Sequence, residues 1–216
     1  MQKTPLTLLE RNVEWARERE ASDPGYFSRL AQLQAPQFLW IGCADSRVPA
    51  NVITGLDPGE VFVHRNVANL VYAADLNCMS VLQFAVDTLK VRYIILCGHY
   101  GCGGVRAAIG EHSNGLIDHW LEPIREIARD SRAELEKLVD AEARVDRLCE
   151  LNVAAQVRQL AHSPILQRAW DRGQMVSIHG WIYGLGNGRL RDLRCGRTFE
   201  GAEQSSGQDA SKGSPT

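Results

Sequence analysis

The chain has 216 residues, of which 44% are hydrophobic and 23% are charged, a composition typical of an ordinary globular protein with one domain. Lys and Arg number 24 against 26 Asp and Glu, which leaves a formal net charge of −2. This balance excludes the basic excess expected of a protein that binds nucleic acid or an anionic membrane, so neither partner is expected.

No apolar run reaches the length of a membrane span. The N-terminal segment MQKTPLTLLERNVEWARERE contains acidic residues and lacks the apolar region of a signal peptide. We therefore expect a cytoplasmic protein. In that compartment the six cysteines are expected to be free thiols, metal ligands or catalytic groups rather than disulfides.

Two helices are predicted before the first strand. Apolar residues recur at helical spacing in the first of them: Leu6, Leu9, Val13 and Ala16. In the following segment SDPGYFSRLAQLQ, Asp23 is expected to cap the second helix, with Pro24 at its first helical position. Residues 1–34 are thus predicted to form a helical arm that packs on the body or on a partner.

Strands and helices alternate after this arm. Four apolar, β-branched segments are predicted to be strands: QFLWIG, EVFVHRN, VRYIILCG and QMVSIHGWIYG. A helix capped by Asp75 is expected between the second and third strands, and helices between 116 and 170, with a restart at Ser163. The alternation predicts an α/β fold, with a mostly parallel central sheet flanked by helices. LRDLR is expected to add a short antiparallel edge strand.

We expect a single domain over residues 1–200. From Gly201 onward the sequence GAEQSSGQDASKGSPT has almost no apolar residues. Residues 201–216 are therefore predicted to be a disordered tail.

Potential metal ligands follow two of the predicted strands where each strand ends. Cys43 comes directly after the first strand, and CGHYGCGG brings His99 and Cys102 after the third. The carboxyl ends of parallel strands meet at one edge of a sheet, where open α/β sheets build their sites. Two thiolates and one imidazole suit zinc and leave a fourth position to be filled.

Asp45 is the nearest candidate for that fourth position. A carboxylate can bind zinc, or it can turn away and admit water, and Arg47 is placed to hold it away through a bidentate pair. Zinc lowers the pKa of a bound water. Because two thiolates donate more charge than imidazoles do, activity favoured by alkaline pH is expected. A helix starting near Gly103 would turn its free N–H groups toward the site and could bind an anion.

Each part of this pattern also has a simpler structural interpretation. Cys43 could be a small buried hydrophobe, Asp45 and Arg47 could form a surface ion pair, and the glycines around Cys102 could be ordinary turn residues. The joint pattern is more specific than any part, because both halves fall at equivalent strand ends.

At these residues the sequence resembles the β-class carbonic anhydrases. CADSR matches the C-x-D-x-R motif of that family and HYGCGG matches its H-x-x-C motif. The likeness continues through GEVFVHRNVANLV, LCELNV and IHGWIYG, over most of the chain. It implies the β-carbonic anhydrase fold and one zinc ion per chain, bound by Cys43, His99 and Cys102. It also implies an Asp45–Arg47 dyad beside the metal.

The resemblance further implies how substrate is held. Gln34 would hydrogen-bond the substrate, and the backbone N–H of Gly103 would contact bicarbonate. An apolar CO2 pocket would use Phe62, Val67 and Phe84, partly from a neighbouring subunit. The family more often has tyrosine at the position of Phe84, so no hydrogen bond is expected from this side chain.

One subtype of the family has a Trp, an Arg and a Tyr that form a non-catalytic bicarbonate pocket, and Trp40, Arg65 and Tyr183 occupy these positions here. A guanidinium and two rings with polar tips can hold a small oxyanion. The alternative interpretation makes Trp40 and Tyr183 core aromatics and gives Arg65 a backbone carbonyl as its partner.

The implied function is that of a lyase, carbonate dehydratase, which hydrates CO2 reversibly to bicarbonate and a proton by zinc-bound hydroxide. Asp45, paired with Arg47, would accept a hydrogen bond from the hydroxide. In an inhibited state, favoured by low pH and by bicarbonate in the second pocket, Asp45 would itself bind zinc. His64 and His112 are the candidates for carrying the proton away. The family assembles as homodimers, commonly paired into homotetramers, with closed symmetry.

Two other functions stay open from the sequence. A zinc-stabilised bicarbonate sensor would need no turnover, although the intact Asp45–Arg47 pair argues against it. Hydrolysis of carbonyl sulfide or carbon disulfide on the same fold is the other. The remaining cysteines are expected to be packing or surface thiols: Cys78, Cys97, Cys149 and Cys195.

Overall fold

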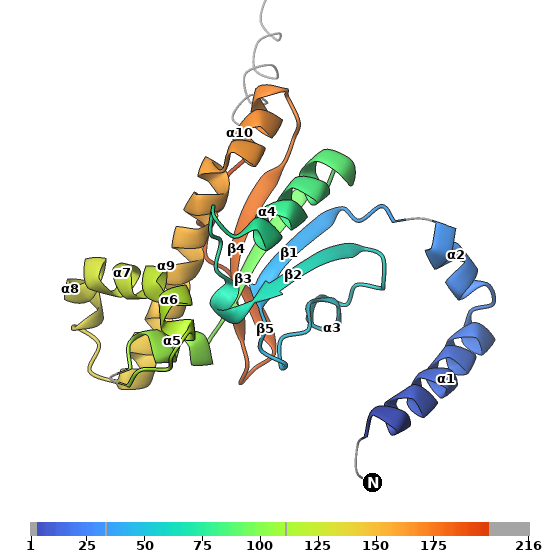
Figure 1. Cartoon of the computed structure of the whole chain (residues 1–216), viewed down its shortest axis with the longest axis horizontal. Coiled ribbons are helices and arrows are strands. Elements are labelled where there is room, and N and C mark those ends of the chain that lie inside the picture. The colour runs from blue at the N-terminus through green and yellow to red at the C-terminus, as the bar shows by residue number, and fades with distance from the viewer. Residues whose placement is uncertain (1–3, 33, 111, 199–216) are drawn as a thin grey trace, which may run out of the picture.

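The computed structural model describes residues 4–32, 34–110 and 112–198, so the predicted tail lies outside the described residues. Its centre is a five-stranded sheet in the order β2-β1-β3-β4-β5 (Figure 1). The strands are β1 (Phe38–Cys43), β2 (Val61–Asn66), β3 (Tyr93–His99), β4 (Ser177–Gly184) and β5 (Arg189–Asp192). The first four are parallel and β5 is antiparallel to β4, which confirms the predicted sheet and its edge strand.

Helices precede the sheet and connect its strands. They are α1 (Pro5–Ser22), α2 (Tyr26–Gln32), α3 (Ala50–Thr54), α4 (Leu76–Gln83), α5 (Gly103–Ala108), α6 (Ile117–Trp120), α7 (Glu122–Asp130), α8 (Arg132–Leu135), α9 (Ala141–His162) and α10 (Pro164–Asp171). Asp75 caps α4 and Ser163 caps α10, as predicted. No helix of the described segments is both long enough and apolar enough to cross a membrane.

The start of α2 differs from the prediction. Asp23 ends α1, and its carboxylate pairs with Arg29 instead of capping α2. Gly25 has a φ of 80°, a left-handed conformation that ordinary helical residues do not adopt, and its N–H donates to Glu20 at 2.7 Å. The segment from Asp23 to Gly25 is therefore a turn, and the prediction that Pro24 opens the helix is wrong.

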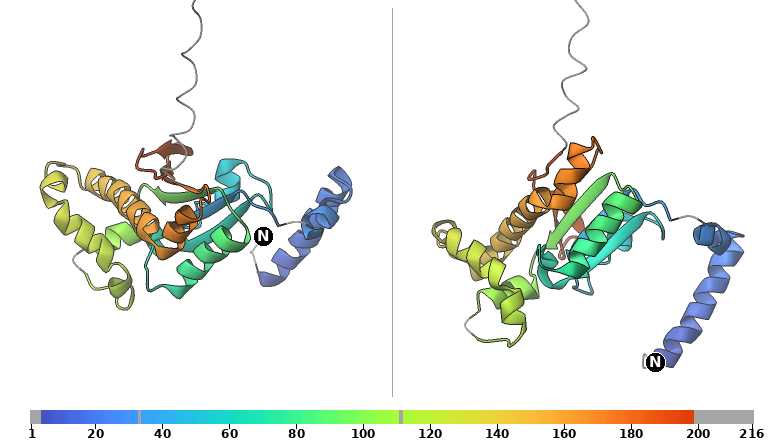
Figure 2. Two further views of the ribbon diagram at one scale, coloured as in Figure 1. Left: turned by 90° about the horizontal axis from the view of Figure 1, so that it is seen from above. Right: turned by 45° about the horizontal axis from the view of Figure 1, so that its top comes forward.

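The two N-terminal helices stand apart from the sheet (Figures 1 and 2). No residue of α1 or α2 is buried. Leu6, Leu9 and Val13, which recur at helical spacing on α1, are 73%, 66% and 50% exposed. Clustered apolar side chains in contact with water favour burial against another surface.

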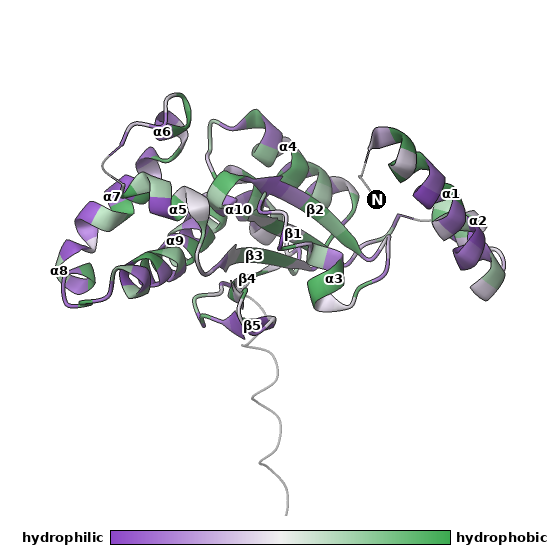
Figure 3. Cartoon of the chain, turned by 90° about the horizontal axis from the view of Figure 1, so that it is seen from below, coloured by the Kyte–Doolittle hydropathy of each residue, from purple (hydrophilic) through white to green (hydrophobic). Residues whose placement is uncertain are grey.

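Side chains alternate between the two faces of the sheet. The main core lies on the face that α4, α9 and α10 cover, and includes Ile41, Leu96 and Ile182. The opposite face carries a smaller cluster around Trp40 and Cys97. Figure 3 shows apolar colouring along the central strands and hydrophilic stretches on α8 and the outer helices. The sheet thus presents a thick core on one side and a thin apolar layer on the other.

Glycines let α9 approach β3 and β4 closely. A Cβ at Gly98 would lie 2.7 Å from Cγ2 of Val153, closer than real contacts allow. Gly98→Ala is expected to lower the free energy of unfolding by about 1–3 kcal/mol through overpacking, as measured by urea denaturation. Gly186→Ala is the matched control, because its added Cβ would meet nothing within 4 Å. An equal loss in both variants would contradict this packing argument.

Candidate metal centre

Three potential metal ligands converge at the carboxyl ends of β1 and β3. Cys43 ends β1, His99 ends β3, and Cys102 is the N-cap residue of α5. Their two sulfurs and one imidazole nitrogen lie within 4.8 Å of one another, and the two Sγ atoms are 3.9 Å apart. All three residues are buried. The structure therefore brings together the three residues that the sequence predicts as metal ligands.

His99 is oriented to offer one nitrogen to this cluster. Its Nδ1 lies 2.9 Å from the carbonyl oxygen of Tyr100. A carbonyl only accepts, so Nδ1 carries the hydrogen and Nε2 keeps its lone pair. Nε2 is buried and has no hydrogen-bond partner among the described residues. Burial without a partner is costly, and a metal ion bound at Nε2 would remove that cost. The donor set fits zinc.

The two thiols of the cluster differ in acidity. The hydrogen bond with Cys102 lowers the pKa of Cys43, against the opposing effect of burial, and His99 and the backbone N–H groups of Asp45 and Ala68 lower it further. The pKa of Cys102 is raised by the same pairing and by burial. The proton that the two sulfurs share therefore favours Cys102, and a bound cation would displace it.

Asp45 lies beside the cluster and faces Arg47. Its Oδ1 accepts the backbone N–H and the Nε–H of Arg47, both at 2.9 Å, and Oδ2 accepts Nη2–H at 2.7 Å. The guanidinium holds the pKa of this carboxyl well below its usual range. Oδ2 is 3.7 Å from Nε2 of His99. The predicted bidentate contact is present, and it keeps an ionised carboxylate at the edge of the ligand cluster.

The three residues predicted to form a bicarbonate pocket share one face of the sheet, but Arg65 is engaged elsewhere. Trp40 and Tyr183 belong to one apolar cluster, and Nε1 of Trp40 is buried without a partner among the described residues. Arg65 lies opposite Gly42 in the strand register and so shares their face. Its Nε donates to the carbonyl of Cys43 at 2.9 Å and its Nη2 donates to that of Asp45. Arg65 is thus bonded to backbone carbonyls of the metal-binding segment.

Of the residues predicted to hold substrate, Gln34, Phe84 and Gly103 are exposed in a single chain, whereas Phe62 and Val67 are partly buried. Phe84 is 44% exposed, and its ring centre is 5.8 Å from that of Phe62. Gln34 is exposed between α2 and β1, and none of the hydrogen bonds found among the described residues involves its side chain. Gly103 begins α5, as predicted, while Val67 precedes a left-handed turn. A single chain therefore leaves Phe84 and Gln34 open to a neighbour.

A second group of potential ligands contains His64, Asp75 and Cys78, within 4.8 Å of one another. The amide of Asn66 is fixed by Leu70, whose N–H donates to Oδ1 at 2.8 Å and whose carbonyl accepts from Nδ2 at 2.7 Å. The remaining amide hydrogen of Asn66 faces Nε2 of His64 at 3.3 Å. That ring nitrogen therefore acts as an acceptor and is already engaged.

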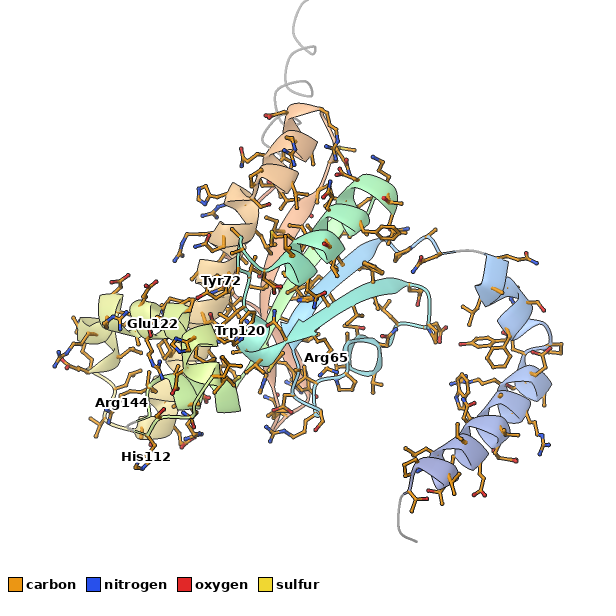
Figure 4. All side chains as sticks on the ribbon, viewed as in Figure 1. Arg65, Tyr72, His112, Trp120, Glu122 and Arg144 are labelled. Atoms are coloured by element: carbon orange, nitrogen blue, oxygen red, sulfur yellow. The ribbon has the colours of Figure 1, made fainter. Side chains whose placement is uncertain are left out.

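The two histidines predicted as proton carriers differ in their surroundings. His64 is buried, and burial lowers its pKa, so its ring stays neutral at physiological pH. His112 is exposed on the loop after α5 and lies at the margin of the molecule in Figure 4. Of the two, His112 is the side chain in direct contact with solvent.

The loop between His99 and Cys102 is held by side chains of α9 and β5 that the sequence analysis did not identify as part of the site. The hydroxyl of Tyr100 donates to Glu150 at 2.6 Å, and the N–H of Gly101 donates to Asp146 at 2.9 Å. The two carboxylates are one turn apart on α9. Arg191 of β5 donates to both Tyr100 and Glu150. The i,i+4 spacing of the two acidic residues can be read from the sequence. Their partners could not be identified, because they are about 45 to 50 residues away in the chain.

Comparison with known sequences identifies relatives over most of the chain. A family model described as carbonic anhydrase matches residues 38–190. A carbonic anhydrase of Emericella nidulans is 44% identical over 193 residues, which cover 89% of this chain and 85% of that protein. A carbonic anhydrase of Saccharomyces cerevisiae is 31% identical, with 86% of this chain and 87% of that protein covered.

Solved structures agree with these relatives. A β-carbonic anhydrase of Coccomyxa in complex with acetazolamide matches with a TM-score of 0.84 and 46% identity, over 89% of this chain and 87% of that chain. One of two tetrameric β-carbonic anhydrases of Sordaria macrospora matches with a TM-score of 0.84 and 40% identity, over 88% and 97% of the two chains.

Proposed function

Because this chain belongs to the β class of carbonic anhydrases, we propose that it catalyses the reversible hydration of CO2 to bicarbonate and a proton. The observation that carries the proposal is the convergence of Cys43, His99 and Cys102 beside a carboxylate that Arg47 holds aside. A purely structural metal site would need neither Asp45 nor Arg47. Stopped-flow CO2 hydration by protein of measured zinc content tests the proposal.

Cys43, His99 and Cys102 would hold one zinc ion per chain. Two thiolates and a neutral imidazole are a donor set that zinc prefers. Nε2 of His99, which has no hydrogen-bond partner in the described part of the chain, supports this assignment. When bound there, zinc supplies the acidity that turns water into a nucleophile near neutral pH.

Asp45 orients the reacting oxygen and receives its hydrogen bond. Its low pKa keeps the carboxylate ionised at neutral pH, so its oxygens act only as acceptors. Three N–H donors of Arg47 fix the direction of this carboxylate, so the acceptor is in place before substrate arrives. The N–H of Gly103 would contact the bicarbonate product, and Gln34 would hydrogen-bond the substrate.

The apolar CO2 pocket is proposed to need a second copy of the chain. Phe84 is exposed beside Phe62, and the apolar stripe of α1 has no partner in the described chain. We therefore propose a homodimer, or a tetramer of paired dimers, in which Phe62, Val67 and Phe84 contribute to a shared pocket. The similar Sordaria macrospora enzymes are tetrameric.

A cytoplasmic location is supported by the six cysteines, all of which are free.

Bicarbonate bound by Trp40, Arg65 and Tyr183 is proposed to inhibit the enzyme. Nε1 of Trp40 is buried and finds no hydrogen-bond partner within residues 4–32, 34–110 and 112–198, which supports an oxyanion site at this position. A bicarbonate ion that takes the guanidinium of Arg65 would remove its bonds to the carbonyls of Cys43 and Asp45. Loss of these bonds would favour the inhibited state, in which Asp45 leaves Arg47 and binds the metal, over the active state, in which Asp45 stays paired with Arg47. Bicarbonate would therefore bind the inhibited state more tightly than the active state.

Arg65→Ala is expected to weaken inhibition by bicarbonate and to make the loss of activity on acidification less steep, approaching the slope of a single proton. The reason is that the variant lacks the group through which bicarbonate would favour the inactive state. Stopped-flow pH profiles with and without added bicarbonate measure both effects. Arg189→Ala, at an exposed position of β5, is the control. A shallow wild-type profile that Arg65→Ala leaves unchanged would count against this regulation.

A second candidate function is a bicarbonate-binding protein without turnover. The Trp40 Nε1, which has no partner among the residues that the structure describes, favours this function as much as it favours an inhibitory site. The two functions separate at Asp45, since binding at Trp40 does not use that carboxylate, whereas catalysis does.

A further inference from the structure

One peptide unit, between Tyr100 and Gly101, connects a carboxylate of α9 to the proposed metal ligand His99. The Nδ1–H of His99 donates to the carbonyl oxygen of Tyr100 at 2.9 Å. The N–H of Gly101, at the other end of the same peptide, donates to Oδ1 of Asp146, also at 2.9 Å. In a trans peptide the C=O and N–H groups point in opposite directions, and the described chain has no cis peptide bond. Asp146 and the imidazole therefore hold opposite sides of one rigid plane.

The backbone of this turn does not itself fix the direction of the peptide. The chain turns at Tyr100 and Gly101, and Gly101 has a φ of 62°. Type I and type II turns differ by a rotation of their central peptide, and only type II requires a positive φ at the third residue. Glycine adopts positive and negative φ about equally readily, so a rotation that turned the Tyr100 carbonyl away from His99 would meet little resistance. Groups outside the turn must therefore hold the carbonyl in place.

Tyr100 itself is anchored to the neighbouring elements. Its N–H donates to the carbonyl of Tyr183 on β4 at 3.0 Å, and its hydroxyl donates to Glu150 on α9 at 2.6 Å. Arg191 of β5 donates to both that hydroxyl and that carboxylate. These contacts fix the residue before the peptide, whereas Asp146 is the side chain that bonds to the peptide itself.

The carboxylate of Asp146 is committed to this contact. Within the described segments it makes a single hydrogen bond, to Gly101, and no ion pair. Glu142, one turn earlier on α9, instead forms a bidentate pair with Arg106. Asp146 is half-buried at the edge of a hollow that Gly101, Arg106 and Glu142 also line. The turn, and not an ion pair, therefore accounts for the position of the Asp146 side chain.

We propose that Asp146 is a positioning residue for His99: its carboxylate holds the Tyr100–Gly101 peptide so that the Tyr100 carbonyl stays directed at the Nδ1–H of His99. A hydrogen bond at one end of a peptide also polarises the other end, so the carboxylate makes that carbonyl a stronger acceptor. A stronger hydrogen bond at Nδ1 raises the basicity of Nε2, the nitrogen left to bind the metal. The consequence is a tighter metal site. This inference rests on the metal binding proposed above for His99.

The test replaces Asp146 by alanine, which removes the acceptor for the Gly101 N–H. The zinc affinity, measured by competition with a chromophoric chelator, is expected to fall by about 10-fold or more. In the NMR spectrum of the zinc-loaded protein, the His99 Nδ1–H resonance is expected to move upfield, because its hydrogen bond weakens. A merely structural role of Asp146 would lower thermal stability without moving this resonance.

Glu142→Ala is the matched control. It removes a carboxylate from the same helix, beside the same hollow, but Glu142 pairs with Arg106 and not with the turn. The zinc affinity and the Nδ1–H resonance are expected to stay at their wild-type values in this control. An Asp146→Ala protein that matches Glu142→Ala in either measurement would overturn the inference.

The outcomes separate this inference from the function on which it rests. Wild-type protein that binds no zinc overturns both, whereas zinc binding with an unshifted Asp146→Ala resonance overturns the inference alone. If Asp146→Ala does not fold, Asp146→Asn carries the test, because asparagine has the same shape and can still accept the Gly101 N–H. Its neutral amide polarises the peptide less than a carboxylate does, so a smaller upfield shift is expected. An unshifted resonance in folded, zinc-loaded Asp146→Asn overturns the inference.

Discussion

Replacing Cys43 with serine is expected to abolish zinc binding and to lower CO2 hydration by about a thousand-fold or more. A serine hydroxyl stays neutral at physiological pH and is a poor replacement for a thiolate donor. Only His99 and Cys102 would remain of the ligand cluster, fewer than the three protein ligands that catalytic zinc sites use. Metal analysis of the purified variant and stopped-flow assays measure the two losses.

Cys97→Ser is the control for this substitution. Cys97 is also a fully buried thiol, but it lies within β3 and belongs to the cluster around Trp40, on the opposite face of the sheet from Cys43. Burial raises its pKa, so it is a neutral thiol that donates to the carbonyl of Gly98 at 3.3 Å. The control should keep its zinc and most of its activity. A Cys43→Ser protein that retains one zinc per chain would contradict the ligand assignment.

Asp45→Asn is expected to keep zinc but to slow CO2 hydration by about 10²–10⁴-fold. Asparagine has the same shape, yet it offers one acceptor oxygen where aspartate offers two. Its NH2 group would also oppose the donors of Arg47, which now point at both carboxylate oxygens. The acceptor for the reacting oxygen would be lost, while the three zinc ligands would remain.

Asp118→Asn removes a comparable ion pair at a distance from the cluster. Asp118 pairs with Arg125 at 2.7 Å, the same separation as in the Asp45–Arg47 pair, and the two aspartate side chains are 18% and 15% exposed. The control should lose stability without losing turnover per zinc. Equal turnover in Asp45→Asn and wild type would contradict the catalytic role of Asp45 and favour the bicarbonate-binding protein.

The sequence was sufficient to predict the sheet and the ligand cluster, because both depend on local pattern. Apolar runs separated by helical segments imply parallel strands, and parallel strands end at one edge. Cys43 and His99 therefore had to come together once their strands were recognised. The Asp45–Arg47 contact was equally local, since only one residue separates the two.

Features that depend on long-range contacts could not be predicted. The left-handed Ala68–Asn69 turn contains no glycine, and it is held by Trp120 and Asn152 from α6 and α9. A backbone carbonyl was the alternative partner expected for Arg65, but which carbonyls it binds, those of Cys43 and Asp45, depends on a contact between segments about 20 residues apart in the chain. The prediction for the start of α2 was wrong for a different reason. Asp23 and Pro24 are typical of a helix start, but the left-handed conformation of Gly25 interrupts the helix there.

The central claim is that Cys43, His99 and Cys102 hold zinc for CO2 hydration. Asp45, paired with Arg47, leaves the fourth zinc position open to water. Stopped-flow CO2 hydration from neutral to alkaline pH, on wild-type protein of known zinc content, tests this most directly. Rapid turnover that requires zinc and rises steeply with pH is the predicted result. The absence of turnover at every pH, in protein that carries one zinc per chain, would contradict it.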